Sequence, residues 1–244
     1  MAVRAVEAAL IGWELPPLPI AFAELPVELD EIGAWCLRCG ESVSAAEVTP
    51  RGCASCRGQR LPWKRFVRVA EYSASLATRI NQVKHLRWSA MAEALGARLA
   101  TQCRVGLASP PDLVVSIPMP WLRRWWRGID HGAWLAGGVA RSLGVPAISV
   151  GAQRSGPPQA SRSRSERLRS RHRFAIAKGE RRLVGRRVLL VDDVRTTGAT
   201  LRQFARLLRD AGAAEVAVGV VAVVPNPRRR VGISRKDAGE SEAG

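Results

Sequence analysis

The residue types that could do chemistry are concentrated in the stretch 188–200, where an apolar run gives way to carboxylates and then to hydroxyl groups. Asp192 and Asp193 follow Val188–Val191, and threonines around Gly198 come next. Carboxylates accept hydrogen bonds from hydroxyl groups, whereas free backbone N–H groups and threonine hydroxyls suit a phosphate. Because adjacent carboxylates repel a phosphate, the pattern predicts a sugar phosphate, with ribose hydroxyls on the acidic pair and the 5′-phosphate in the loop.

The neighbouring segments predict how these residues are positioned. Val188–Val191 has the uninterrupted apolar pattern of a strand buried on both faces of a parallel sheet. Apolar residues then recur at helical spacing, namely Leu201, Phe204, Ala205 and Leu208. We therefore expect Asp192 and Asp193 where the strand leaves the sheet, and the loop at a helix N-terminus, whose dipole favours an anion. The residues expected to bind the phosphate are Thr196, Thr197, Gly198, Ala199 and Thr200.

The stretch 192–200 contains neither a P-loop nor a dinucleotide-binding fingerprint. It resembles the signature of type I phosphoribosyltransferases, which bind 5-phosphoribosyl 1-pyrophosphate (PRPP). The resemblance implies that Asp192 and Asp193 hold the ribose hydroxyls, that the loop holds the 5′-phosphate and that Mg²⁺ accompanies PRPP. Purine salvage enzymes of this class carry a carboxylate at the position of Thr196, which argues against hypoxanthine or guanine as the substrate. The alternative is an acidic strand end followed by a polar turn.

A second group of candidate ligands consists of two Cys-x-x-Cys pairs, Cys36 with Cys39 and Cys53 with Cys56. Each pair can clamp one side of a tetrahedral ion, and four thiolates complete a closed structural Zn²⁺ site. Disulfides or a redox motif are the alternatives; the lack of a secretory signal disfavours the first and the missing βαβ context the second. Cys103 stands alone and is predicted to be a small buried apolar residue.

The charge balance points to acidic partners. The 244 residues carry a formal net charge of +17, and 47% hydrophobic content is ample for a core. Such an excess of positive charge favours phosphates or nucleic acid. Single-stranded DNA is therefore a candidate partner beside PRPP or ribose 5-phosphate, although an arginine-biased composition would give the same excess.

Basic residues gather in two segments that are expected to form loops near the ligand. Segment 118–128 follows an apolar strand and lies at the carboxyl end of the expected sheet, where open α/β folds bind ligands. Segment 159–173 has the composition of a mobile flap. The arginines expected to neutralise a leaving pyrophosphate are Arg123, Arg124, Arg127 and Arg167.

Other residues in the basic segments allow two interpretations each. Trp125 and Trp126 could stack on bases or sugars, or anchor their loop on a neighbouring helix. Lys84 and Arg87 could reach a phosphate or form a solvated helix face.

Apolar periodicity predicts a doubly wound α/β domain, because helical patterns alternate with buried strands. Strands are expected at 66–72, 113–117, 145–150, 188–191 and 216–224, and helices at 76–86, 91–99, 134–143 and 201–208. The first strand alternates in the manner of an edge strand.

Taken together, the four cysteines, the loop ending in Arg127-Gly128, the Gln159 to Arg167 spacing and the acidic pair make residues 33–224 resemble the ComF family. That family joins a small zinc module to a phosphoribosyltransferase domain and is associated with DNA uptake in competent bacteria. The resemblance implies a type I phosphoribosyltransferase-like, doubly wound, mainly parallel sheet preceded by a small zinc-ribbon-like Cys₄ module. The expected division is an N-terminal adapter (1–32), the zinc module (33–62), the phosphoribosyltransferase-like domain (63–224) and a disordered basic tail (225–244).

The implied function is binding of PRPP or a 5-phosphoribosyl group, linked to DNA uptake or nucleotide metabolism, with DNA-uptake proteins as partners. The alternative is a catalytically inactive accessory factor that binds single-stranded DNA on the same fold. After Arg127-Gly128 the family usually continues Phe-Asn-Gln, whereas this chain has Ile129-Asp130-His131, and Ser170 stands where an Asn is usual. Both changes fall in loops expected to face the pyrophosphate. Enzymatic transfer and the acceptor are therefore left open.

The N-terminal residues predict no export signal. Arg4 and Glu7 interrupt the apolar start, and no stretch reaches the ~20 apolar residues that span a bilayer. We expect a cytoplasmic protein without membrane insertion.

Overall fold

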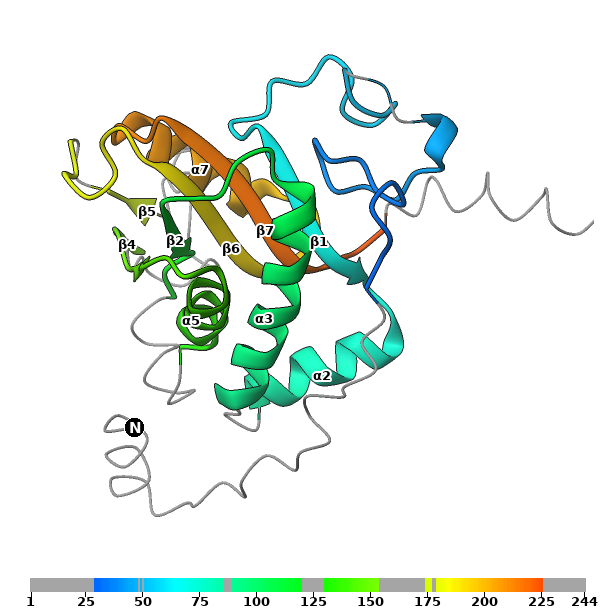
Figure 1. The fold of residues 1–244 in the computed structure, drawn as a ribbon, viewed down its shortest axis with the longest axis horizontal. Coiled ribbons are helices and arrows are strands. Elements are labelled where there is room, and N and C mark those ends of the chain that lie inside the picture. Colours follow the sequence, from blue (N-terminus) through cyan, green and yellow to red (C-terminus); the bar gives the residue numbers. More distant parts are fainter. Residues whose placement is uncertain are drawn as a thin grey trace, which may run out of the picture.

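A five-stranded parallel sheet forms the centre of the protein in the computed structural model, which describes residues 29–47, 49, 51–85, 89–119, 130–153, 174–176 and 179–225. The strand order is β1-β7-β6-β2-β3, and each neighbouring pair is parallel. The strands are β1 (Arg65–Glu71), β2 (Leu113–Ser116), β3 (Ala147–Ile148), β6 (Arg187–Arg195) and β7 (Glu215–Val223). Figure 1 shows β6 and β7 as the long inner strands.

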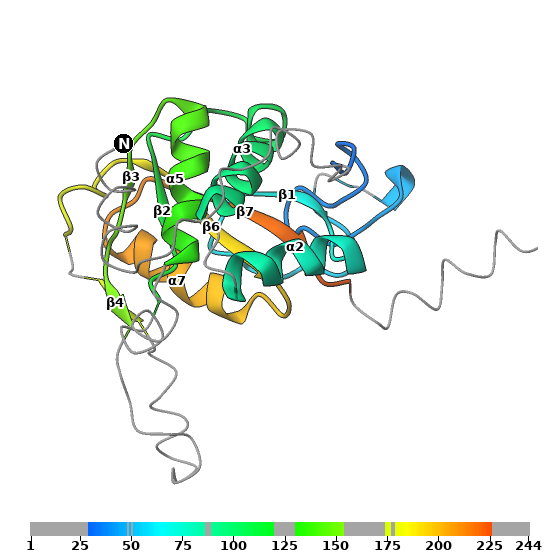
Figure 2. The ribbon, with the colours of Figure 1, turned by 90° about the horizontal axis from the view of Figure 1, so that it is seen from below.

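Helices cover both faces of this sheet. They are α2 (Ala74–His85), α3 (Ser89–Gly106), α5 (His131–Leu143) and α7 (Ala199–Asp210). Leu189 and Val191 of β6 belong to the core formed with α3 and α5, whereas Val188 and Leu190 belong to the core formed with α7. This alternation follows from the two-residue period of a strand. Figure 2 shows α3 and α5 on one side of the sheet and α7 on the other, which confirms the predicted doubly wound fold.

The chain path creates a ligand-binding position beside β6. Its neighbour β2 is followed by α5 on one face, whereas β6 is followed by α7 on the other face. Where successive connections diverge in this way, a crevice opens outside the carboxyl ends of the two strands. The acidic pair of β6 therefore lies at the position where open α/β sheets bind ligands.

Two features of the sheet region differ from the sequence-based expectation. The strand predicted at 145–150 is limited to Ala147–Ile148. Pro146 has no N–H to donate, and β3 pairs with β2 only at Val114 and Val115. A separate antiparallel ribbon joins β4 (Ala152–Gln153) to β5 (Phe174–Ala175) and was not predicted. The ribbon pairs the residues directly before position 154 with those directly after position 173.

The segment with the four cysteines packs against β1. It contains a bridge between Trp35 and Ser42 and the short 3₁₀ helix η2 (Ala45–Glu47). The backbone N–H of Phe66 in β1 donates to Leu37 (2.7 Å), and the Trp63 indole donates to the carbonyl of Arg38 (2.8 Å). β1 is an edge strand, as predicted, but most of it is buried because this segment covers it. None of the helices in the described ranges has the length and apolarity needed to cross a membrane.

Candidate functional site

Asp192 and Asp193 lie within β6, just past the point where β2 ends. The β2–β6 pairing stops at Ser116 and Val191, whereas the pairing of β6 with β7 continues to Arg195. The strand thus runs further than the sequence predicted, because β7 supplies partners beyond the acidic pair. Both carboxylates are partly buried, and consecutive strand residues point to opposite faces of the sheet.

Backbone hydrogen bonds orient the two carboxylates. Asp192 Oδ1 accepts from the N–H of Asp193 (3.0 Å), and Asp193 Oδ1 accepts from the N–H of Val194 (2.7 Å). These bonds fix one oxygen of each side chain close to the backbone. Both residues lie past the end of the β2 pairing, at the carboxyl ends of β2 and β6.

His131, the first residue of α5, faces Asp193. Its Nε2 lies 3.5 Å from Asp193 Oδ2, and the two side chains are 13% and 18% exposed. Asp130 caps the same helix by accepting from the N–H of Ala133 (3.1 Å). Sequence reasoning noted 129–131 only as a departure from the family pattern and missed this contact. The available signal was that this segment follows β2, the neighbour of β6.

The loop after β6 presents hydroxyl and N–H groups together. Gly198 adopts the left-handed conformation (φ 71°, ψ 11°) and is the N-cap residue of α7, with no side-chain capping hydrogen bond. Thr196, Thr197 and Thr200 are exposed, and Thr197 Oγ1 lies 3.4 Å from the N–H of Ala199. A helix N-terminus of this kind attracts anions. All the predicted phosphate-binding residues therefore lie in one loop and the first turn of α7.

The other residues predicted to contact the ligand lie in the two basic segments and near the end of α2. Residues that lie outside the described ranges are Arg87, Arg123, Arg124, Trp125, Trp126, Arg127 and Arg167, and the side chain of Lys84 is likewise not described. The described site consists of the β6 carboxylates, His131 and the loop leading into α7.

The four cysteines converge as the spacing predicted. Their sulfur atoms all lie within 4.8 Å of one another, and all four residues are buried. The distances are 3.7 Å from Cys36 to Cys56, 3.6 Å from Cys39 to Cys53 and 4.0 Å from Cys53 to Cys56. These values are too long for disulfide bonds but close to the ~3.8 Å expected between thiolates in a tetrahedral Zn²⁺ site with Zn–S bonds of about 2.3 Å.

Close packing shifts the pKa values of these thiols in opposite directions. A hydrogen bond from Cys39 lowers the pKa of Cys36 to about 4 and in turn raises the pKa of Cys39. Burial raises the pKa of Cys56 to about 11. Four thiolates packed this closely need a positive ion to offset their repulsion and dehydration.

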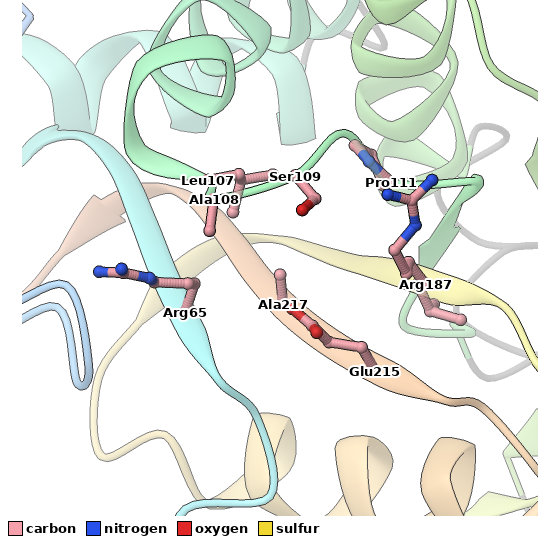
Figure 3. Close-up of a pocket in the computed structure, with 9 residues that line it drawn as sticks. Arg65, Leu107, Ala108, Ser109, Pro111, Arg187, Glu215 and Ala217 are labelled. Carbon is pink, nitrogen blue, oxygen red and sulfur yellow. The ribbon is translucent and has the colours of Figure 1, made fainter.

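A small pocket lies at the opposite edge of the sheet. Figure 3 shows Arg65, Arg187 and Glu215, from the amino ends of β1, β6 and β7, beside the loop that includes Ser109 and Pro111. Its volume of about 10 Å³ is room for about one water molecule. It therefore does not hold a sugar phosphate, and the candidate site is the carboxyl end of β6 with the loop that follows it.

A parallel sheet whose central strand carries an acidic pair, followed by a threonine-rich loop and a helix, defines a type I phosphoribosyltransferase-like domain. A family model described as "Phosphoribosyl transferase domain" matches residues 128–242. The DNA utilization protein YhgH of Escherichia coli K12 is 33% identical over 187 residues, which cover 75% of this chain and 81% of that protein. The chain belongs to the YhgH and competence protein F (ComF) family.

Two further proteins are similar to parts of this chain. Competence protein F of Haemophilus influenzae is 27% identical over 187 residues, covering 74% of this chain and 82% of that protein. A solved glutamine PRPP amidotransferase of B. subtilis, in complex with ADP and GMP, aligns with a TM-score of 0.40 and 26% identity, covering 53% of this chain and 25% of the other.

Proposed function

We propose that the chain binds PRPP or another 5-phosphoribosyl ligand in the crevice beside β6. The observation that carries this proposal is the order of groups along one continuous segment. Two partly buried carboxylates, Asp192 and Asp193, come first, and the exposed threonines and the N-terminus of α7 follow. The spacing suits a ribose whose hydroxyls meet the carboxylates and whose 5′-phosphate meets the loop.

Each group has a separate role in this proposal. Asp192 and Asp193 accept hydrogen bonds from the ribose hydroxyls, and the 5′-phosphate accepts bonds from the loop 196–200. Arg127 and Arg167 neutralise the pyrophosphate. Mg²⁺, when bound with PRPP, supplies positive charge to the pyrophosphate and the ribose hydroxyls. If transfer of the phosphoribosyl group takes place, its acceleration comes mainly from these fixed charges.

Calorimetry with full-length protein tests the binding proposal. PRPP is expected to bind in the micromolar to millimolar range and to need Mg²⁺, whereas ribose 5-phosphate, which lacks the pyrophosphate, is expected to bind without it. Folded, metal-loaded protein that binds neither compound would refute the proposal. A turnover screen of PRPP against bases and amines then identifies an acceptor, if one exists.

We further propose that Cys36, Cys39, Cys53 and Cys56 hold one structural Zn²⁺. The support is that the four buried sulfur atoms lie within 4.8 Å of one another, as a tetrahedral Zn²⁺ site needs. Metal analysis of protein purified without chelators should give one zinc per chain. A zinc content near zero in folded protein would exclude this assignment.

Single-stranded DNA binding is a second candidate function. Relatives are named for DNA utilization and competence, and the net charge of +17 supports contacts with nucleic-acid phosphates. Such contacts release counterions, so the affinity should fall steeply as salt increases. A mobility-shift titration at low and moderate salt measures this dependence. Lack of a retarded species at low salt would rule out DNA binding by the isolated chain.

A further inference from the structure

A buried ion pair links the cysteine-containing segment to the phosphate loop. Arg195, the last residue of β6, places Nη2 2.8 Å from Glu41 Oε2, and the side chains are 10% and 7% exposed. Glu41 lies two positions after Cys39, and Arg195 lies directly before Thr196. The interaction thus joins the proposed Zn²⁺ site to the proposed phosphate site.

The position of Glu41 depends on the turn that carries Cys36 and Cys39. The Glu41 carbonyl accepts from the N–H of Cys36 (2.9 Å), and the Cys36 carbonyl accepts from the N–H of Gly40 (2.7 Å). Gly40 has a φ of +80°, and a Cβ at this position would lie 2.2 Å from the Phe66 ring. The turn is therefore pressed against β1. An ion that holds both thiolates fixes the backbone from which the Glu41 carboxylate projects.

The side chain of Arg195 packs against the loop at Gly198. Its Cγ and Cδ lie 3.6 Å from the point where a Cβ on Gly198 would be, so the arginine stem is next to the backbone of the loop. The guanidinium also lies over the Phe66 ring, 5.8 Å from its centroid. A buried charge that loses its partner is strongly destabilising. Arg195 would therefore have to move toward water if Glu41 were displaced, and its stem would no longer support Gly198.

A second connection reaches the same loop. Arg202 of α7 donates from Nη2 to Oε1 of Gln59 (3.0 Å) and from Nη1 to the carbonyl of Thr197 (3.3 Å). Gln59 is itself held by Arg38, whose Nη2 donates to its carbonyl (2.5 Å). Arg38 is the residue before Cys39. Both cysteine pairs thus lie close in sequence to residues that contact the loop or its helix.

We propose that the four-cysteine module, defined here as residues 33–62, holds the phosphate loop in its binding conformation, so that phosphoribosyl affinity depends on metal occupancy. Glu41 and Arg195 are the positioning residues, and Arg202 with Gln59 forms a second link. The ligand side of this proposal rests on the proposed function. The structural coupling of the module to residues 194–204 does not depend on which ligand binds there.

Glu41→Gln in the full-length chain tests the coupling, because it keeps the side-chain shape and removes the charge. Hydrogen exchange in peptides covering 194–204 should accelerate, and affinity for ribose 5-phosphate should fall by about tenfold or more, because Arg195 is left buried without a counter-charge. Glu93→Gln is the control, since Glu93 and Arg141 form a pair of the same 2.8 Å separation on α3 and α5, but their side chains are 18% and 65% exposed, so losing the charge strands no buried partner. This control should leave both measurements at their wild-type values.

Arg195→Met completes a double-mutant cycle. Arg195→Met leaves the Glu41 carboxylate buried without this partner, so adding Glu41→Gln should cause no further loss, and a large interaction term between the two substitutions is expected. Removing the metal with a chelator should accelerate exchange at 194–204 as well as at 33–62. A peptide covering β2 serves as the internal reference for folded protein.

The outcomes separate this inference from the proposed function. Wild-type ribose 5-phosphate affinity and exchange in both Glu41→Gln and metal-free protein would overturn the coupling while the binding function stands. If wild-type protein binds neither ribose 5-phosphate nor PRPP with Mg²⁺, the binding function fails, and the exchange measurements alone decide the coupling. Faster exchange confined to 33–62 after metal removal would also contradict it.

Discussion

Asp192 and Asp193 are neighbours in sequence but have different surroundings. Asp193 lies on the sheet face covered by α5, where His131 is 3.5 Å from its Oδ2. Asp192 points to the opposite face, which α7 covers, because successive strand side chains alternate. The two carboxylates are therefore expected to contribute unequally to ribose binding.

Asp193→Asn tests the carboxylate beside His131. The change keeps the shape of the side chain but replaces charged hydrogen bonds, worth ~1.5 to 3 kcal/mol, with neutral ones worth ~0.5 to 1.5 kcal/mol. The affinity for a phosphoribosyl ligand should fall by about tenfold or more. Calorimetry with ribose 5-phosphate measures the loss, and native circular dichroism is the control. Unchanged affinity would show that Asp193 does not contact the ligand.

Asp112 gives a pH-dependent contribution to stability at the amino edge of the sheet. Hydrogen bonds from the Arg187 side chain and backbone, at 2.7 Å and 2.8 Å, lower the pKa of Asp112 to about 2. A lowered carboxyl pKa stabilises the folded state above the unfolded pKa, and this contribution is lost as the pH falls towards 2.

Asp112→Asn should therefore reduce the urea midpoint modestly at pH 6, and the difference from wild type should shrink between pH 4 and pH 2. The effect is modest because the Asp112 and Arg187 side chains are 25% and 42% exposed. Urea titrations at a series of pH values provide the measurement. A difference that stays constant down to pH 2 would contradict this pKa.

Some site residues could be predicted from the sequence and others could not. The acidic pair and the threonine loop form one continuous segment, so their order alone indicated a sugar phosphate. Arg68 and Arg195 are almost fully buried, although charged residues are expected to be exposed. Their carboxylate partners, Asp30 and Glu41, come from distant parts of the chain. A local sequence pattern does not predict ion pairs between residues that lie so far apart in the chain.

At the scale of elements, the Cys36–Gly40 turn has little room for a larger residue at its last position. Gly40→Ala would place a left-handed conformation on a residue with a Cβ, at a cost of about 1 to 2 kcal/mol. It would also force that Cβ into the Phe66 ring. We expect a lower free energy of unfolding and weaker zinc retention, measured by thermal unfolding and competition with a chelator. Gly58→Ala is the control, since its φ is also positive but no atom lies within 4 Å of its Cβ.

Periodicity predicted the longer elements because each buries a regular apolar face. Leu201, Phe204 and Leu208 of α7 are fully buried, as their helical spacing indicated. The β4–β5 ribbon has only two residues in each strand, and its partners are separated by the segment 154–173. Such short strands have no period to detect, so their pairing appears only in the folded structure.

At the scale of the whole molecule, the four-cysteine module and the sheet domain should respond differently to metal loss. Cys39→Ser removes one ligand and should loosen residues 33–62, because small metal modules depend on their ion for folding. The sheet should stay folded around its own cores. Zinc analysis and limited proteolysis of the variant test this. Cooperative unfolding of the whole chain would contradict independent stability of the sheet domain.

The two proposed ligands can be separated in one variant. Asp192→Asn combined with Asp193→Asn should abolish most phosphoribosyl binding but maintain or slightly strengthen DNA binding, since it removes negative charge from a basic protein. Parallel calorimetry and mobility-shift titrations measure both. Loss of both ligands in natively folded protein would indicate that DNA occupies the sugar-phosphate site.

The pairing of β1 with β7 also has a consequence for synthesis. Arg65 of β1 pairs with Ala217 of β7. The edge strand β1 is made early in translation and therefore stays unpaired until β7, the last strand of the sheet, has been synthesised. At about 5 to 20 residues per second, this delay lasts several seconds or more, during which apolar surface is exposed. A ribosome that stalls before Glu215 would release a chain with an incomplete sheet. We expect such nascent chains to depend on chaperones more than the finished protein does.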